Sequence, residues 1–294
     1  MRRLAAFIVV AVALAPIALA QQPVFRSSVD AVRIDVSVMS GVRPVAGLTA
    51  ANFVLTDAGV VQTIDRVEVD SVPLNIMLVL DISGSMHGDR LTDLAAATRR
   101  LVQALKPDDA AALFTFNEPA EWRVPMTRDR EALLTAIDSL KAEGATSLYD
   151  GLFLSLQMRP DTTEARTVAL VFSDGRDTAS WLSRTSLTET IRRSGVVTHI
   201  VELLPEEARL SERSSVSSVL DGLADVGGGR RWPATSSRAL QELFVRVLDE
   251  LRSRYLLTYY PTGVAREGWH DVKVTLKSAR GDVIARPGYF VAPP

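Results

Sequence analysis

The sequence predicts an α/β fold: a doubly wound, mostly parallel sheet that is inserted in, or flanked by, a small antiparallel β-sandwich. Strongly apolar runs alternate with helical patterns over residues 72–254, which is typical of parallel sheets. Residues 21–71 and 255–294 instead contain strands in which apolar and polar residues alternate, the pattern of antiparallel strands with one solvated face. Each end segment has too few strands to form a stable core of its own, so we expect the two segments to pair with each other.

The first 20 residues are predicted to be a secretory signal peptide. Arg2 and Arg3 are basic, residues 4–17 are mostly apolar, and Ala18-Leu19-Ala20 is a small-x-small cleavage site. The apolar run is short for a membrane span, which needs about 20 residues. We therefore expect an exported protein, periplasmic or secreted, with no transmembrane anchor after cleavage; an uncleaved anchor is the alternative.

Length and composition limit which classes of protein and which partners the sequence is compatible with. The 294 residues are 47% hydrophobic, which is ample for one large or two modest domains, and the formal net charge is −2. Charges of both signs are mixed along the chain without a basic block, so nucleic acid is not an expected partner. The chain has no cysteine, which excludes disulfides, iron–sulfur clusters and a cysteine nucleophile.

The end segments each contain candidate strands. In the first, Val32 to Val38 alternate with polar residues, and turn residues such as Ser40-Gly41 separate the runs. An aromatic-rich run and an alternating run open the second segment, and its last run is broken by Pro287-Gly288. The expected strands cover residues 32–38, 53–55, 60–69, 255–260, 272–276 and 282–291.

Between these segments, strands and helices alternate. The helices are expected from apolar residues that recur with a period of 3.6, and the strands from short runs of consecutive apolar residues. The three glycines at 227–229 indicate a turn between a helix and a strand around Arg231-Trp232. The expected strands are 76–80, 110–116, 167–175 and 196–203, and the expected helices span 91–105, 133–140, 216–223 and 240–251.

Side chains with hard oxygen atoms appear where two of the apolar strands end. Asp81, Ser83 and Ser85 stand at alternate positions in the run LVLDISGSM, and Asp174 ends the run TVALVFSD. Thr146 lies between them on a short loop before a helix. In open parallel sheets, ligands bind beyond the carboxyl ends of the strands. This donor set suits Mg²⁺, Mn²⁺ or Ca²⁺ and argues against zinc, which prefers His and Cys.

In this order, the three segments resemble the metal-ion-dependent adhesion site (MIDAS) of von Willebrand factor type A (VWA) domains, as in integrin I domains. The resemblance covers about residues 72–254 and implies a Rossmann-like strand order. It implies that Ser83, Ser85 and Thr146 bind the metal directly, whereas Asp81 and Asp174 act largely through bound water. The layout with flanking strands is also similar to that of bacterial secreted VWA-related proteins.

Each of these residues also has an ordinary structural interpretation. Asp81 and Ser83 would fit a turn that caps the next helix, and Asp174 would fit a plain exit from a strand. Three matches in the right order favour the metal site, with Mg²⁺ as the first choice of ion. For His87 and Asp177, contact with a ligand and exposure on a loop both remain open. Asp150 is expected to stabilise a helix N-terminus.

The function expected from the sequence is metal-dependent protein binding, without enzyme activity. Neutral hydroxyls leave much of the cation's charge unmet, so an exposed Glu or Asp of a partner protein can complete the shell, as the VWA resemblance also implies. A structural protein in which the metal ties loops together is one alternative. A hydrolase with a metal-activated water is another, with His87 as the histidine nearest in sequence.

Overall fold

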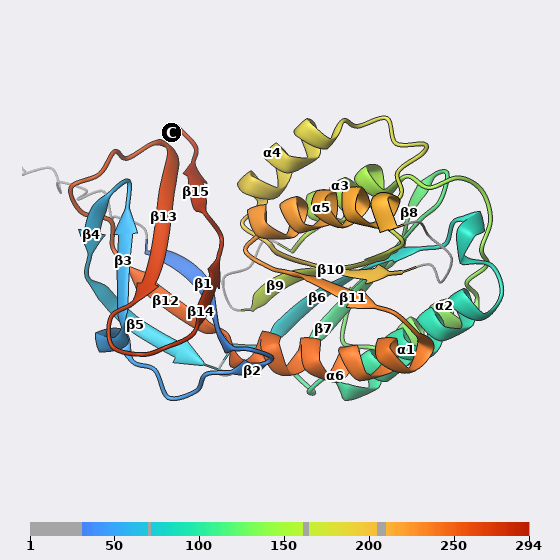
Figure 1. Cartoon of the computed structure of the whole chain (residues 1–294), viewed down its shortest axis with the longest axis horizontal. Coiled ribbons are helices and arrows are strands. Elements are labelled where there is room, and N and C mark those ends of the chain that lie inside the picture. The colour runs from blue at the N-terminus through green and yellow to red at the C-terminus, as the bar shows by residue number, and fades with distance from the viewer. Residues whose placement is uncertain (1–30, 70–71, 161–164, 205–209, 294) are drawn as a thin grey trace, which may run out of the picture. The chain divides into compact units, whose positions relative to one another are not determined.

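Three β-sheets organise the part of the chain that the computed structural model describes, namely residues 31–69, 72–160, 165–204 and 210–293 (Figure 1). The signal peptide predicted at residues 1–20 lies outside these ranges, as do residues 21–30 of the predicted N-terminal segment.

The central sheet has six strands in the order β11-β10-β9-β6-β7-β8. All neighbouring strands are parallel except β8, which runs antiparallel to β7 at the edge. Every residue of β6 is buried, as expected for a strand that is covered on both faces. The prediction of a mostly parallel sheet is therefore confirmed. Its strands are β6 (Leu74–Asp81), β7 (Ala110–Phe116), β8 (Ala120–Thr127), β9 (Arg166–Ser173), β10 (Val197–Leu203) and β11 (Arg231–Ala234).

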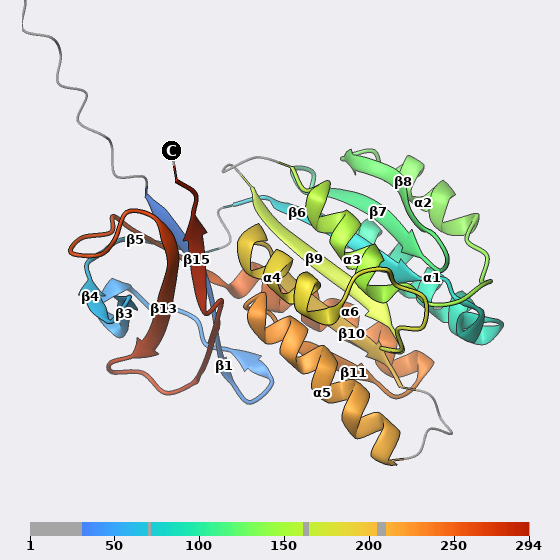
Figure 2. The ribbon, with the colours of Figure 1, turned by 90° about the horizontal axis from the view of Figure 1, so that it is seen from above.

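Helices cover both faces of the central sheet (Figures 1 and 2). One layer consists of α1 (Asp89–Ala104), α2 (Arg130–Asp138) and α6 (Ser237–Ser253). The opposite layer consists of α3 (Leu148–Gln157), α4 (Arg184–Ser194) and α5 (Leu210–Val226). The sheet and the two layers enclose two apolar cores, which is the doubly wound arrangement. Short 3₁₀ turns lie at Ala50–Asn52 and Gly84–Met86.

The flanking strands form two antiparallel sheets, β14-β1-β12-β5 with β2 beside β1, and β15-β13-β3-β4. Both sheets combine strands from before and after the central domain, which alternate in the first sheet: β1 pairs with β12, and in the second sheet β3 pairs with β13. Their apolar side chains share one core, which supports the predicted sandwich. The strands are β1 (Val32–Ser40), β2 (Arg43–Pro44), β3 (Phe53–Asp57), β4 (Val60–Gln62), β5 (Ile64–Val69), β12 (Tyr255–Tyr259), β13 (Gly268–Leu276), β14 (Asp282–Ala285) and β15 (Gly288–Val291).

A buried carboxylate connects the two sheets of the sandwich. Asp57, on β3, accepts hydrogen bonds of 2.8 Å from the hydroxyls of Tyr259 and Tyr289. Its other oxygen lies 2.9 Å from Nδ1 of His270. Because Tyr259 belongs to one sheet and the other three residues belong to the second, this cluster holds both sheets while it satisfies the buried charge.

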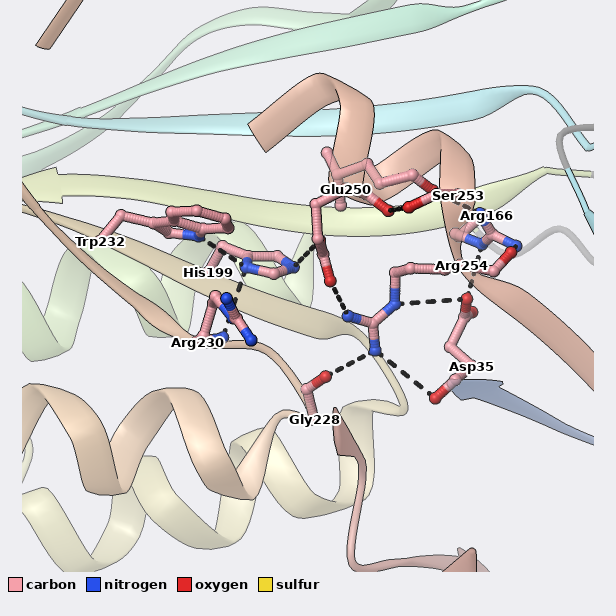
Figure 3. Close-up of polar contacts among 10 residues, drawn as sticks. Asp35, Arg166, His199, Gly228, Arg230, Trp232, Glu250, Ser253 and Arg254 are labelled. Atoms are coloured by element: carbon pink, nitrogen blue, oxygen red, sulfur yellow. Dashed lines mark hydrogen bonds and ion pairs between the residues drawn. The ribbon is translucent and has the colours of Figure 1, made fainter. Parts of the chain in front are cut away.

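A second buried polar network lies between the sandwich and the central domain (Figure 3). Asp35, on β1, pairs with Nε of Arg166 at 2.7 Å and lies 3.7 Å from Nε of Arg254. Arg254 is fully buried; it donates to Glu250 at 2.8 Å and to the carbonyl of Gly228 at 2.6 Å. The buried guanidinium groups thereby gain ion-pair and carbonyl partners, although the Nε atoms of Arg166 and Arg254 make no hydrogen bond of regular geometry among the described residues.

Candidate metal centre

The carboxyl edge of the central sheet brings the predicted site residues together. β6 and β9 are parallel neighbours whose last pair is Leu80 and Phe172. Asp81 comes one residue after Leu80 and Asp174 comes two residues after Phe172, so both carboxylates lie at the same edge, at the point where their strands end.

The carboxylate of Asp81 is fully buried and held on both oxygens. Oδ1 accepts hydrogen bonds from the backbone N–H of Ser83 at 2.9 Å and from its hydroxyl at 2.6 Å. Oδ2 accepts a hydrogen bond of 2.8 Å from the hydroxyl of Ser173. Burial raises the pKa of Asp81 to about 6, and the nearby charge of Asp174 adds to this rise, while the hydrogen bonds oppose it. A cation at this position would stabilise the charged form.

Ser83 and Ser85 present two hydroxyl oxygens that lie 3.2 Å apart. Oxygens in neighbouring positions of an octahedral Mg²⁺ shell are about 3 Å apart, because each lies at about 2.1 Å from the ion. Ser83 is buried, whereas Ser85 is exposed. The pair therefore fits two adjacent ligands of one cation, with the side of Ser85 open to solvent.

Main-chain hydrogen bonds tie three loops together at this edge. The loop after β6 is joined to the loop before α3 by a bond from the N–H of Gly84 to the carbonyl of Gly144, at 2.8 Å. The next residues of that loop are fixed by the segment after β9: the carbonyl of Thr146 accepts from the N–H groups of Thr178 and Ala179. The hydroxyl of Thr178 accepts from the N–H of Thr146 at 3.0 Å. Thr146 is thereby held at the same edge as the two serines.

Both aspartates also make the turn contacts that the alternative interpretation predicts. Asp81 accepts from the N–H of Ser83, and Asp174 accepts from the N–H of Arg176 at 3.2 Å. These hydrogen bonds use part of the accepting capacity of each carboxylate and fix its orientation. They are compatible both with a turn and with a role in metal binding. The ligand roles of the five residues therefore remain a prediction.

Two further carboxylates organise the loop after β9. Asp177 accepts hydrogen bonds from the N–H of Tyr149 and from the hydroxyl of Ser180. Asp150, in the first turn of α3, accepts from the N–H groups of Trp181 at 2.9 Å and Leu182 at 3.1 Å. Asp150 therefore anchors this loop, in addition to its expected place at the helix N-terminus.

His87 lies on the rim of a neighbouring cavity. It is exposed, and the cavity of about 430 Å³ is formed where α1 and α6 begin and where β10 and β11 end. Its polar lining includes Asp89, Arg90 and Ser236. The predicted metal site thus has an adjoining hollow on the same edge of the sheet.

Two residues of the site were not predicted from the sequence, Ser173 and Thr178. Ser173 bonds to Asp81, and Thr178 bonds to the backbone of Thr146. Ser173 directly precedes Asp174 at the end of an apolar strand, and this position is the signal that could have identified it. Across the described residues, no three His, Cys, Asp or Glu side chains cluster in a way that could hold a metal ion; the candidate centre consists instead of three hydroxyls and two carboxylates.

A mostly parallel sheet that is covered by helices on both faces places this part of the chain among the doubly wound α/β domains. The family model of the von Willebrand factor type A domain matches residues 76–176. All five residues predicted to form the metal centre lie within this match.

Relatives are similar over parts of the chain. An uncharacterized protein of Synechocystis sp. is 35% identical over 109 residues, which are 36% of this chain and 26% of the relative. Inter-alpha-trypsin inhibitor heavy chain H3 of Mesocricetus auratus is 31% identical over 102 residues, 33% of this chain and 12% of the relative. The chain thus matches about a quarter or less of the length of these two relatives.

Two solved structures share the fold. The von Willebrand factor type A protein from Catenulispora acidiphila has a TM-score of 0.52 at 15% identity and covers 88% of this chain and 72% of its own. Proximal thread matrix protein 1 from the mussel byssus, with a zinc-occupied MIDAS motif, has a TM-score of 0.53 at 19% identity and covers 65% and 48%. Together with the family model, these structures support a VWA domain with the VWA fold in this chain.

The described part of the chain contains no helix that is both long enough and apolar enough to cross a membrane.

Proposed function

We propose that this protein is a metal-dependent protein-binding module. Its divalent cation, Mg²⁺ in the first place, is held by Asp81, Ser83, Ser85, Thr146 and Asp174, and a Glu or Asp of a partner protein completes the shell. The observation that carries the proposal is the pair of serine hydroxyls 3.2 Å apart beside a buried carboxylate that no cationic side chain contacts among the described residues.

The charges of the site support a carboxylate as the incoming ligand. The three hydroxyls are neutral, and the two aspartates are engaged by hydrogen bonds from Ser83, Ser173 and Arg176. A cation in this setting retains positive charge toward solvent on the side of Ser85. An external carboxylate supplies negative charge there and replaces a water, which is ordinary coordination chemistry for Mg²⁺ and Mn²⁺.

The surface beside the site supports a protein as the partner. Trp181 is 97% exposed, although Asp150 binds the backbone N–H at this position. Tryptophan is enriched among the residues that dominate protein interfaces, because it buries a large area with few rotatable bonds. A loop that is held to the first turn of α3 and carries an exposed tryptophan offers a surface to which a partner can bind.

The organisation and location of the protein belong to the same proposal. We assign residues 72–254 to the VWA domain, and residues 21–71 together with 255–294 to the sandwich. With the signal peptide at residues 1–20, the protein would act outside the cytoplasm, in the periplasm or secreted. The zinc-occupied MIDAS motif of the mussel protein supports a divalent cation in this fold, and zinc is therefore included in the test.

Calorimetric titration with Mg²⁺, Mn²⁺ and Zn²⁺ tests the metal centre. The protein should bind one ion, and Asp81→Ala and Ser85→Ala should abolish or strongly weaken the binding. Ser40→Ala, which removes an exposed hydroxyl of β1, is the matched control. If the titration curves of Asp81→Ala and Ser85→Ala equal that of the control, the ion binds elsewhere.

The class of function is tested by a partner isolated with the Mg²⁺-loaded protein and compared in EDTA. Binding should require the ion and one Glu or Asp of the partner, and changing that residue to its amide should remove the requirement. A partner that binds equally in EDTA would favour the structural alternative, in which the metal ties loops together. Turnover of ester, peptide or phosphate substrates by the metal-loaded protein would favour the hydrolase alternative.

A further inference from the structure

A cavity rich in arginine lies at the opposite edge of the central sheet from the candidate metal centre. It encloses about 300 Å³ and is bordered by β1, by the beginning of β9, by the C-terminal end of α4 and by the turn between β14 and β15. Four of its lining residues are arginines and one is acidic. The charged lining residues are Arg33, Asp35, Arg159, Arg166 and Arg286.

The single acidic residue is already paired. Asp35 lies 2.7 Å from Nε of Arg166 and 3.7 Å from Nε of Arg254 (Figure 3). The remaining nitrogens of Arg166 donate to the carbonyls of Leu251 and Arg254. Asp35 and Arg166 therefore neutralise each other, and the described lining retains an excess of positive charge.

Arg286 has a donor without a partner at this cavity. Nη2 of Arg286 donates to the carbonyl of Arg33 at 2.8 Å, and Nη1 lies beside Gly195, where an added Cβ would approach it to 2.8 Å. Nε is buried and has no hydrogen-bond partner among the described residues. Burial lowers the pKa of Arg286, while the negative charge of Asp35 opposes this effect without supplying an acceptor for Nε. A buried cationic donor without an acceptor is costly, and an anion beside it would remove that cost.

Arg159 offers a second cation at the mouth of the same cavity. It follows the C-terminal end of α3 and is exposed; Nη1 donates to the carbonyl of Leu156 at 2.9 Å. Guanidinium groups bind carboxylate and phosphate oxygens with two parallel hydrogen bonds, which a lysine cannot do. The cavity volume of about 300 Å³ is at the lower end of the range for sites that bind small molecules.

We propose that this cavity binds an oxyanion, a phosphate or carboxylate group, through Arg286 and Arg159. The bound group would accept from Nε of Arg286 and from the outer guanidinium of Arg159. It would thereby connect the turn between β14 and β15, which belongs to the sandwich, with the end of α3, which belongs to the central domain. The competing explanation is that Arg286 only stabilises the carboxyl end of α4, where Gly195 is the C-cap.

The test is calorimetric titration of the full chain with inorganic phosphate and, separately, with succinate, in EDTA and at constant ionic strength set by chloride. EDTA makes the result independent of the proposed metal centre. At least one of the two anions should give saturable binding, and the anion that binds identifies the source of the oxyanion. Arg286→Gln and Arg159→Gln should each weaken it about tenfold or more, as expected for hydrogen bonds to charged groups.

Arg266→Gln is the matched control, because Arg266 is exposed on the loop before β13 and does not line the cavity. It should leave the affinity unchanged. Arg159→Gln removes a side chain at the surface, so it keeps the test decisive if Arg286→Gln does not fold. The proposal is overturned if neither anion binds saturably, or if Arg159→Gln and Arg286→Gln bind as the control does.

Discussion

Asp35 on β1 and Arg166 at the beginning of β9 form an ion pair of 2.7 Å that joins the sandwich to the central sheet. Arg166 is almost entirely buried, with 3% of its side chain exposed, and Arg254, the second arginine beside Asp35, is fully buried. The two parts of the fold therefore share buried charges, and a change at Asp35 on one side leaves arginines uncompensated on the other.

Asp35→Asn should destabilise the protein by about 3 kcal/mol, because loss of one partner leaves a buried charge unpaired. Chemical denaturation at neutral pH measures this loss. Asp65→Asn is the control, since Asp65 is exposed on β5. Equal midpoints for the two variants would show that the pair contributes nothing to stability.

Asp57→Ala should destabilise the sandwich by about 2–4 kcal/mol, because two tyrosine hydroxyls and His270 would lose their shared acceptor in the core. Thr56→Ala, at the next position of β3 and on its other face, should have a much smaller effect. Thermal unfolding checks the difference. A melting temperature of Asp57→Ala near that of Thr56→Ala would contradict a stabilising role for the cluster.

Ser173→Ala should weaken binding of Mg²⁺ or Mn²⁺ about 10-fold or more, although Ser173 is not a predicted ligand. Its hydroxyl orients Asp81 through a hydrogen bond of 2.8 Å, and loss of such supporting bonds typically costs 10- to 100-fold in metal affinity, by order of magnitude. Ser139→Ala, which removes a hydroxyl at the end of α2, is the control for calorimetric titration. Unchanged affinity in Ser173→Ala would mean that Asp81 is oriented without this bond.

Asp150→Ala should loosen the loop that contains Trp181. The carboxylate of Asp150 accepts from the N–H groups of Trp181 and Leu182, so their hydrogen exchange should accelerate by about tenfold or more when these charge-assisted bonds are lost. Exchange in β6 should stay as it is and serves as the internal reference. Continued protection of both amides would show that other contacts fix the loop.

The contribution of His199 to stability should fall as the pH is lowered from about 7 to about 5, because His199 is buried in its neutral form. Burial lowers its pKa from 6.5 to about 4, and its Nδ1 already accepts from the N–H of Arg230 and from the indole of Trp232. The unfolded chain therefore binds a proton in this range while the folded chain does not, which lowers stability by about 2 kcal/mol at pH 5. Asp81, whose pKa burial raises to about 6, contributes with the opposite sign in this range.

Denaturation at several pH values checks this prediction, with His199→Gln as the comparison. The difference in unfolding free energy between the two proteins should change by about 2 kcal/mol between pH 7 and pH 5, whatever the overall stability of the variant. An identical slope in both proteins would assign the pH dependence to other groups.

The sequence predicted the buried strands of the central sheet because a parallel strand is apolar along its whole length, as in β6 and β9. It did not predict β8, in which Val124 is the only buried residue of a mostly exposed edge strand that contains Pro125. α4 was also missed, because Leu187 and Ile191 are its only buried residues. Both elements have too few apolar residues to show a period.

One expected single strand proved wrong in its extent. The expected strand at 60–69 divides into β4 and β5, which lie in different sheets. The chain bends at Gln62, whose side chain accepts from the N–H of Thr262 at 2.9 Å, a contact between residues far apart in sequence. The break expected at Pro287-Gly288 within the run 282–291 is confirmed: β14 and β15 lie on either side of it and in different sheets, and Pro287 cannot donate a ladder hydrogen bond.

The candidate site shows the same limit. Asp81 and Asp174 could be placed at one edge from the sequence, since the ends of neighbouring parallel strands meet there. The hydrogen bond from the N–H of Thr146 to the hydroxyl of Thr178 could not be predicted, because it joins two loops 32 residues apart. Its donor is a backbone group, which is the same for almost every residue type.

The alternation of early and late strands in the sandwich has a consequence for biosynthesis. The hydroxyl of Tyr255, on β12, donates to the carbonyl of Val45, 210 residues earlier in the chain. At usual translation rates the first strands wait about 10–40 s for the strands that cover them. During this time their backbone edges are open to pairing with other chains. Until the last strands emerge, the nascent protein therefore depends on cellular factors that keep these open edges from pairing with other chains.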